Sequence, residues 1–156
     1  QSIVDCTMGE HTIIRSFVNL YGCTIGNHCM IGTFVEIQKG VLIGNYVRVQ
    51  SHSFICEGVT IEDDVFIGHH VVFINDKYPR ATSMKGKAIA PVDWKLLPVR
   101  VKKGSSIGSN ATILGGITIG IKSLVGAGSV VTKDVPDYAV VIGNPAHVTG
   151  RVPDAK

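Results

Sequence analysis

Apolar residues recur at every sixth position along most of the chain. The longest unbroken series contains nine of them: Ile25, Ile31, Ile37, Ile43, Val49, Ile55, Ile61, Ile67 and Phe73. After a break, the series resumes with Val101, Ile107, Ile113, Ile119, Val125 and Val131. It also extends backwards, more weakly and with one residue dropped, through Leu20, Ile14 and Met8. The pattern therefore spans nearly the whole chain.

A period of six fits neither an α-helix, with its period of 3.6, nor a continuous amphipathic strand, with its period of two. It fits short strands joined by turns, and a glycine often follows the apolar residue, where it can supply turn geometry. A short fixed period over a long stretch is typical of a β-solenoid. We therefore predict an all-β fold, a parallel β-helix formed as a single domain over residues 1–156.

The repeat is broken once, after Phe73. Residues 75–100 lack the pattern and include side chains that often bind ligands, among them Tyr78, Arg80 and Trp94. Loops of this length are uncommon in compact domains and are usually functional or disordered. We therefore predict one long loop excursion over 75–100, which serves binding, and a short C-terminal cap segment over 137–156.

Charge also divides at the break. Residues 1–76 contain 3 Lys/Arg and 8 Asp/Glu, a net charge of −5, whereas residues 77–156 contain 12 and 4, a net charge of +8. A basic half indicates an anionic partner, for which phosphate is the usual group, unless it is only a solvated surface. The basic residues are dispersed, with few aromatic residues between them, so we do not expect a nucleic-acid partner.

The cysteines, the lack of long apolar stretches and the first residues of the chain bear on its cellular location. The four cysteines (Cys6, Cys23, Cys29 and Cys56) lack C-x-x-C spacing and are interpreted as small apolar fillers, which favours a reducing, cytoplasmic location. No stretch approaches the roughly 20 apolar residues of a membrane span, so no membrane partner is expected. No signal-peptide pattern opens the chain, and because it begins at Gln1 we expect that its natural start has been trimmed.

The six-residue pattern resembles that of the hexapeptide-repeat acyltransferases, which fold as left-handed parallel β-helices. The resemblance implies three hexapeptides per triangular coil of eighteen residues, with coils stacked at a strand spacing of roughly 4.8 Å. It also implies a homotrimer with active sites in the clefts between subunits. Residues eighteen apart in unbroken repeat should then lie almost on top of each other.

This spacing predicts two columns of polar side chains. Counting back from Asn75 by eighteen gives Glu57, and by a further eighteen gives Lys39, with Asp76 beside the top of the column. His52 and His70 should form a second column, with His69 adjacent. Carbonic anhydrases of the same fold bind zinc through three histidines, but no third ligand is evident at a suitable spacing here, so we expect no metal.

The segment "FINDKYPRA" (73–81), with its flanks at 51–72 and 101–120, resembles the members that acetylate an amine on a nucleotide-linked sugar. The resemblance implies that Glu57, Asn75 and Asp76 are catalytic: the two carboxylates accept hydrogen bonds or a proton from the amine, and Asn75 positions it. The residues implied to bind the substrate are Lys39, Lys77, Tyr78 and Arg80. Members that acetylate hydroxyls carry a His directly before the loop proline, where this chain has Tyr78.

The difference between the two acceptors is chemical. A sugar hydroxyl is a weak nucleophile and needs a positioned base. An amine with a pKa of roughly 8 is already partly neutral and needs positioning and oxyanion stabilisation instead. Since no Cys or Ser stands out as an acyl carrier, we expect direct attack in a ternary complex.

The C-terminal segment "VGAGSVVTKDVPDYAVVIGNPA" (125–146) resembles the signature of the same family, in which acetyl-CoA lies along the last coils. The resemblance implies a cofactor site at Gly108, Ser109, Gly126, Ala127, Lys133 and Arg151, with the two basic residues near phosphates. The cofactor is thus expected to be acetyl-CoA, as co-substrate.

These observations favour an acetyl-CoA-dependent N-acetyltransferase that acts on a dTDP- or UDP-linked 3- or 4-amino sugar. Two other enzymes stay open: a saccharide O-acetyltransferase with His69 or His70 as base, and a zinc-binding trimer of the carbonic-anhydrase type. A non-catalytic β-helix scaffold is the remaining alternative.

Overall fold

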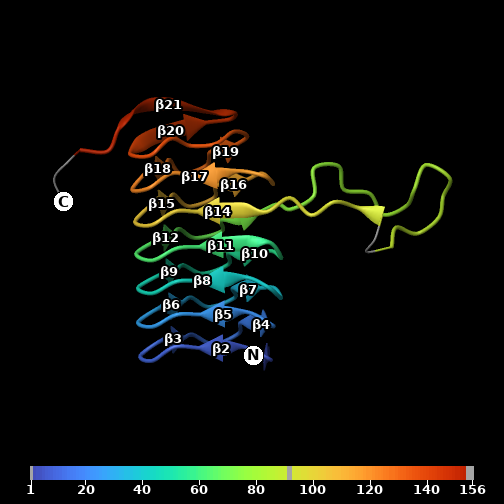
Figure 1. Ribbon diagram of the computed structural model, residues 1–156, viewed down its shortest axis with the longest axis horizontal. Helices are drawn as coiled ribbons and strands as arrows, with labels where there is room; N and C mark the ends of the chain where they lie inside the picture. The colour runs from blue at the N-terminus through green and yellow to red at the C-terminus, as the bar shows by residue number, and fades with distance from the viewer. Residues whose placement is uncertain (1, 91–92, 154–156) are drawn as a thin grey trace.

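The computed structural model describes residues 2–90 and 93–153, which form a triangular prism of short strands stacked in coils (Figure 1). Sheet A contains β1 (Ser2–Val4), β4 (Asn19–Tyr21), β7 (Glu36–Ile37), β10 (Phe54–Ile55), β13 (Val72–Phe73), β16 (Thr112–Ile113) and β19 (Val130–Val131). Sheet B contains β2 (Thr7–Met8), β5 (Thr24–Ile25), β8 (Leu42–Ile43), β11 (Val59–Ile61), β14 (Val99–Val101) and β17 (Thr118–Ile119). Sheet C contains β3 (Ile13–Ile14), β6 (Met30–Ile31), β9 (Arg48–Val49), β12 (Phe66–Ile67), β15 (Ser106–Ile107), β18 (Leu124–Val125), β20 (Ala139–Gly143) and β21 (Ala146–Arg151).

Three corners join the sheets, and each is named after the sheets that it connects. Corner AB comprises residues 5–6, 22–23, 38–41, 56–58, 74–90, 93–98, 114–117 and 132–134. Corner BC comprises residues 9–12, 26–29, 44–47, 62–65, 102–105, 120–123 and 136–138. Corner CA comprises residues 15–18, 32–35, 50–53, 68–71, 108–111 and 126–129. No helix in the described part of the chain is long and apolar enough to cross a membrane.

Strands of successive coils pair in parallel and in the predicted register. Glu36 pairs with Phe54 and Phe54 with Val72, each eighteen residues further along the chain. The first coil is one residue shorter, so that Ser2 pairs with Asn19, which accounts for the residue dropped from the repeat. Val72 pairs with Thr112, forty residues on, so the coil that contains the excursion has 22 extra residues. The all-β, left-handed parallel β-helix predicted from the sequence is therefore confirmed.

The apolar series forms the interior of the prism. All nine residues of the first series and all six of the second are buried. Four serines, Ser53, Ser105, Ser123 and Ser129, take inward positions beside them, and each hydroxyl has a hydrogen-bond partner. Polar groups inside the narrow core are thus paired, as burial requires.

Backbone geometry at the corners explains two ladders of aromatic side chains. Apart from residues 132–134, each corner turn contains a residue with positive φ, and in many coils this is not a glycine. Because the coils are in register, such residues lie above one another. On corner CA, Phe17, Phe34, His52 and His70 form one ladder, with neighbouring ring centroids 4.6–5.3 Å apart. On corner BC, His11, His28 and Tyr46 form the other. Ring stacking offsets part of the cost, about 1–2 kcal/mol per residue, of the left-handed conformation.

A ladder of side-chain amides and carboxylates runs along corner BC. The side chains of Asn27, Asn45 and Asp63 each accept a hydrogen bond from a backbone N–H of the coil below, at 2.7–2.8 Å. These N–H groups lie at turns, where the strand ladder does not pair them. The side chains therefore continue the hydrogen bonding between coils around the corner.

The excursion leaves the prism from corner AB as an arm (Figure 1). Strand β14 begins at Val99, so residues 99–100, which the repeat had assigned to the excursion, belong to a strand. The N–H of Leu97 donates to the carbonyl oxygen of Asn75 at 2.9 Å and closes the base of the arm. At the C-terminus, β20 extends sheet C and β21 returns antiparallel to it above the last coil.

Glu62 fastens the chain where it re-enters the prism after the arm. Its Oε1 accepts a hydrogen bond from Nε of Arg100 at 2.8 Å, and its Oε2 accepts one from the N–H of Lys103 at 2.9 Å. Burial by itself would raise the pKa of Glu62, but the hydrogen bond from Lys103 and the Arg100 guanidinium outweigh it and leave this pKa lowered. The ionised form is therefore stabilised in the folded protein.

We expect Glu62→Gln to make stability less sensitive to acid. A carboxylate whose pKa is lowered on folding contributes stability above its unfolded pKa and loses it as pH falls through the folded value. The variant should melt about 2–4 °C below wild type at neutral pH, and the difference should shrink below pH ~4. Thermal melts across this range test it, with Asp5→Asn, an exposed carboxylate on the first coil, as control. A pH-independent difference would contradict the argument.

Candidate active site

The predicted column lies on corner AB. The Nζ of Lys39 is 3.7 Å from Oε2 of Glu57, and Nδ2 of Asn75 donates to the backbone oxygen of Glu57 at 2.9 Å. The structure thus brings Lys39, Glu57 and Asn75 together from three successive coils. Both partners of the ion pair are more than a third exposed, so the pair orients Glu57 rather than contributing much to stability.

Asp76 begins the arm next to this column. Its Oδ1 accepts a hydrogen bond from the N–H of Tyr78 at 2.9 Å. This bond closes a local turn between the side chain and the backbone two residues further on. The bond fixes the orientation of the carboxylate and leaves its second oxygen for another partner. Asn75 and Asp76 are both half-buried, whereas Lys77, Tyr78 and Arg80 are exposed.

Two cavities flank Asp76 at the base of the arm. The first, called the acceptor cavity, has a volume of about 410 Å³ and is lined by Ile74, Asp76, Lys77, Pro79, Leu97, Leu114, Gly115 and Thr132. The second, called the aromatic cavity, has a volume of about 360 Å³ and is lined by Asp76, Lys77, Tyr78, Asp93, Trp94, Lys95 and Leu97. Asp76, Lys77 and Leu97 belong to both, so the cavities adjoin.

Gly115 and Thr132 were not among the predicted site residues. Gly115 lies one coil above Asn75, and a Cβ there would be 3.0 Å from the carbonyl oxygen of Ile74 and 2.7 Å from Cβ of Leu97. The absence of a side chain at Gly115 therefore lets Leu97 and the backbone of Ile74 approach closely at the wall of the acceptor cavity. The repeat contained the information needed to place Gly115 above Asn75, because Phe73 and Ile113 hold equivalent positions forty residues apart. Counting by eighteen missed it, since such counting does not cross the break.

Among the predicted substrate-binding residues, Lys77 and Tyr78 form a local pair. The Nζ of Lys77 is 5.6 Å from the centroid of the Tyr78 ring, within the range of a cation–π interaction. Arg80 is exposed further along the arm and lines neither of the two cavities.

The three histidines considered in the sequence, His52, His69 and His70, lie on corner CA, at the other end of sheet A from Asn75. His52 and His70 stack as predicted, with ring centroids 4.6 Å apart and planes inclined by 7°. His69 lies within 2.9 Å of the Ser51 hydroxyl through Nδ1. Because the two rings are nearly parallel, the nitrogen lone pairs of His52 and His70 lie in separate planes and do not converge on a single metal ion. Within residues 2–90 and 93–153, no three His, Cys, Asp or Glu side chains are grouped to hold a metal.

The residues predicted to bind acetyl-CoA are divided among three places in the prism. Gly108, Ser109, Gly126 and Ala127 lie in the turns of corner CA, where Gly128 donates from its N–H to the oxygen of Ser109 at 2.8 Å. Lys133 lies on corner AB, beyond β19. Arg151 ends β21, paired with Ala139 next to corner BC. They do not form one cluster within the chain.

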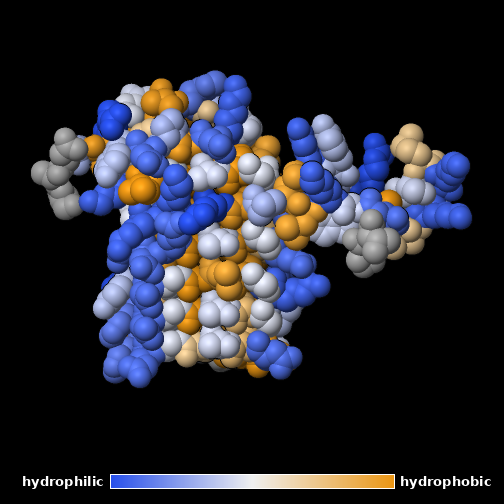
Figure 2. All heavy atoms as spheres, viewed as in Figure 1, coloured by the Kyte–Doolittle hydropathy of each residue, from blue (hydrophilic) through white to orange (hydrophobic). Residues whose placement is uncertain are grey.

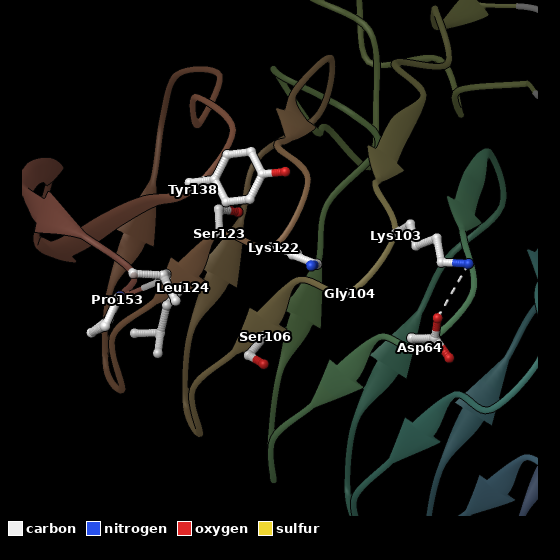
Figure 3. Close-up of a pocket in the computed structure, with 10 residues that line it drawn as sticks. Asp64, Lys103, Gly104, Ser106, Lys122, Ser123, Leu124, Tyr138 and Pro153 are labelled. Atoms are coloured by element: carbon white, nitrogen blue, oxygen red, sulfur yellow. Dashed lines mark ion pairs between the residues drawn. The ribbon is translucent and has the colours of Figure 1, made fainter. Parts of the chain in front are cut away.

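A larger cavity, of about 570 Å³, lies on corner BC (Figure 3). Lys103 and Lys122 line it, and Tyr138, Leu124 and Pro153 line its other side. Lys103 is neutralised by Asp63 and Asp64, at 4.0 and 3.4 Å. The cavity contains none of the predicted catalytic or cofactor residues, so its size alone does not make it the reaction site.

Three of the four cysteines lack the features of an acyl carrier. Cys23, Cys29 and Cys56 are buried, and burial raises the pKa of all three thiols: to about 12 for Cys23, where the Cys6 thiol contributes further, and to about 11 for Cys56. The thiolate, which is the nucleophilic form, is therefore suppressed. This supports direct transfer over a thioester on the protein.

Two segments of the chain match known family models. Residues 22–57 match "Bacterial transferase hexapeptide (six repeats)", and residues 98–133 match "Hexapeptide repeat of succinyl-transferase". The two matches lie on either side of the arm. They confirm the predicted resemblance to hexapeptide-repeat acyltransferases.

Individual relatives are also acetyltransferases. A dTDP-3-amino-3,6-dideoxy-alpha-D-galactopyranose 3-N-acetyltransferase of Aneurinibacillus thermoaerophilus is 60% identical over 52 residues, which cover 33% of this chain and 27% of the relative. A serine acetyltransferase of Buchnera aphidicola is 33% identical over 131 residues, covering 78% of this chain and 40% of the relative. The chain thus spans well under half the length of these curated relatives.

Among solved structures, a mutant form of AntD, an N-acyltransferase from Bacillus cereus in complex with dTDP and coenzyme A, superposes with a TM-score of 0.83. The sequences are 22% identical, and the alignment covers 95% of this chain and 84% of AntD. At this identity the likeness supports the fold.

We expect the buried cysteines to resist alkylation. At neutral pH, a pKa of about 11 lowers the thiolate fraction of Cys56 on the order of 100-fold below that of an unperturbed thiol. With iodoacetamide, peptide mass spectrometry should find Cys6 modified and Cys23, Cys29 and Cys56 spared, while all four react in denaturant. Fast alkylation of Cys56 that acetyl-CoA prevents would instead implicate this thiol in transfer.

Proposed function

The chain carries hexapeptide repeats that match those of bacterial transferases. We propose that it transfers an acetyl group from acetyl-CoA to the amine of a nucleotide-linked amino sugar. The observation that carries this proposal is the Lys39–Glu57–Asn75 column together with Asp76, which follows Asn75 in the chain and lines the acceptor cavity. The relative that is 60% identical over 52 residues acetylates a dTDP-linked 3-amino sugar. Among dTDP- or UDP-linked 3- and 4-amino sugars, this relative favours the dTDP-linked 3-amino class as the acceptor of our chain.

The polar groups at this site suit an amine acceptor. The carboxylates of Glu57 and Asp76 can each accept a hydrogen bond from a protonated or neutral amine. Asn75 donates from Nδ2 to the backbone of Glu57, which fixes the amide and leaves its oxygen as an acceptor. An amine with a pKa near roughly 8 provides enough neutral nucleophile once it is held in place.

In the proposed reaction, the neutral amine nitrogen attacks the thioester carbon of acetyl-CoA. A C–N bond forms, and the carbonyl electrons move to oxygen to give a tetrahedral intermediate. When the carbonyl re-forms, the C–S bond breaks and the electron pair leaves with sulfur. One amine proton passes to Asp76 or Glu57 and then to the thiolate, so that the products are an N-acetyl sugar and coenzyme A.

We further propose that the active site is completed by a second copy of the chain in a homotrimer. The acceptor residues lie on corner AB, whereas the small residues predicted to bind acetyl-CoA lie on corner CA. Sheet A connects these corners, and its outer side presents Phe54, Val72 and Val130, with Phe17 and Phe34 exposed on corner CA. Packing this apolar face between copies would bring corner AB of one chain to corner CA of the next.

Acceptor chemistry is tested with a panel of sugar nucleotides. Thiol release from acetyl-CoA should require an amino sugar linked to dTDP or UDP, and Glu57→Gln and Asn75→Ala should lower kcat on the order of 100-fold through misplacement of the amine. Glu10→Gln, an exposed carboxylate on the first coil, is the control. Transfer to hydroxyl sugars that depends on His69 or His70 would replace the proposal with O-acetylation.

Subunit mixing tests the shared site. Ala127→Trp should block corner CA and the double variant Asn75→Ala/Asp76→Ala should disable corner AB, each leaving an inactive trimer. When the two proteins are unfolded and refolded together in equal amounts, each interface draws its two corners from different chains, so about one quarter of wild-type activity should return. Mixing Ala127→Trp with Gly108→Trp, both on corner CA, should restore none. Failure of the first mixture would place the site within one chain.

A further inference from the structure

The aromatic cavity has a composition that the proposed chemistry of amine acetylation does not use. Tyr78 and Trp94 are drawn from the two ends of the arm, and Lys77 and Lys95 stand beside them in sequence and in the cavity lining. Figure 2 shows hydrophilic and apolar side chains gathered together where the arm leaves the prism. Flat aromatic surfaces next to ammonium groups are the elements that bind a base and its phosphates.

The two lysines are free to meet an anion. The ion pairs formed in the described part of the chain engage Lys39, Arg100, Lys102 and Lys103, but neither Lys77 nor Lys95. The two carboxylates in the cavity lining accept hydrogen bonds from backbone N–H groups. Oδ1 of Asp76 accepts the N–H of Tyr78, and Oδ2 of Asp93 accepts the N–H of Ala90 at 2.8 Å. Both aspartates therefore shape turns, and none of the ion pairs in the described part of the chain joins them to the two lysines.

The position of the cavity matches the layout of a sugar nucleotide, in which a diphosphate joins the base to the sugar. Trp94 and Lys95 line only the aromatic cavity, whereas Lys77 lines the boundary and Gly115 and Thr132 line only the acceptor cavity. A ligand laid across the boundary would have its base beside Trp94 in the aromatic cavity and its sugar in the acceptor cavity, with Lys77 and Asp76, which line both, at the junction. This arrangement places the sugar amine within the cavity that Asp76 lines.

We propose that the aromatic cavity is the nucleotide subsite of this enzyme, binding a pyrimidine nucleoside diphosphate with its base against Trp94 and Tyr78 and its diphosphate on Lys77 and Lys95. The proposal rests on the proposed function, because it assigns the nucleotide part of the same acceptor. It also gives Tyr78 a role in binding rather than in proton transfer.

Electrostatics and stacking set the expected behaviour of this subsite. Two lysines and two aspartates leave the lining with no net charge, so binding depends on close contacts and should respond only modestly to salt. Stacking on an aromatic ring tolerates different bases. The subsite should therefore accept dTDP and UDP with similar affinity, and discrimination between acceptors should come from the sugar in the acceptor cavity.

The experiment uses Trp94, which is the only tryptophan in the chain, as the reporter. Titration of the protein with dTDP should quench its fluorescence in a saturable manner, with the same Kd by calorimetry. Trp94→Ala should weaken dTDP binding about tenfold or more in calorimetry, whereas Trp94→Phe, which keeps a ring, should stay within a few-fold of wild type. Lys95→Ala should weaken dTDP but leave thymidine unchanged.

Met84→Ala is the matched control, since Met84 is on the same arm, is 87% exposed and lines neither cavity. Its dTDP affinity should equal that of wild type. Unchanged dTDP affinity in both Trp94→Ala and Lys95→Ala, or calorimetric binding without any change in emission, would overturn the proposal. So would a failure of dTDP and UDP to bind the wild-type protein.

Acetyl transfer separates this proposal from the proposed function. If wild-type protein acetylates the amino-sugar nucleotide and Trp94→Ala does so with an unchanged acceptor KM, the subsite is wrong and the function stands. If dTDP binding depends on Trp94 and Lys95 while no acceptor of the panel is acetylated, the subsite stands and the function is wrong. A raised acceptor KM in Trp94→Ala, with unchanged KM for acetyl-CoA, supports both.

Discussion

The register between successive coils is the constraint on which the rest of this molecule depends. Parallel pairing at eighteen residues places each side chain over its equivalent in the coil below. Inward positions then share one narrow core, which accepts aliphatic residues and a few paired serines. The same stacking aligns the corners, so that aromatic rings, amides and carboxylates form ladders. Local side-chain chemistry thereby reinforces the register that produced it.

The candidate active site arises where this register is interrupted without being lost. An insertion of 22 residues leaves β16 paired with β13, as an ordinary coil would be. The inserted chain has no place in the prism, so it leaves corner AB as an arm, anchored by the Asn75–Leu97 hydrogen bond at its base and by Glu62 just beyond it. Functional groups that would disturb a regular coil are tolerated there, because the prism below and above is unchanged.

The sequence predicted the prism in detail because its period carries the register directly. Column partners such as Glu57 and Asn75, and the stacked His52 and His70, followed from counting by eighteen once the resemblance had implied three hexapeptides per coil. Counting fails inside the arm, where no repeat fixes which residues meet. The cavity wall at Gly115 and the approach of Trp94 to Tyr78 depend on the path of the arm. The dispersal of Lys133, Arg151 and Ala127 over the prism likewise depends on which turn each occupies, and a resemblance between signatures does not convey it.

The two parts of the molecule can therefore serve recognition in different ways. The prism offers repeated corners, and the proposed thioester cofactor, laid along corner CA, would need only small residues at successive turns, such as Ser109 and Ala127. The arm offers rings, lysines and a carboxylate that the repeat excludes from the core, and it shares the acceptor cavity with Leu114, Gly115 and Thr132 of the prism, so it can contribute features that distinguish one acceptor from another. Changing the arm while keeping β13 paired with β16 would then alter the acceptor without altering the proposed cofactor site, because the register on both sides would be preserved.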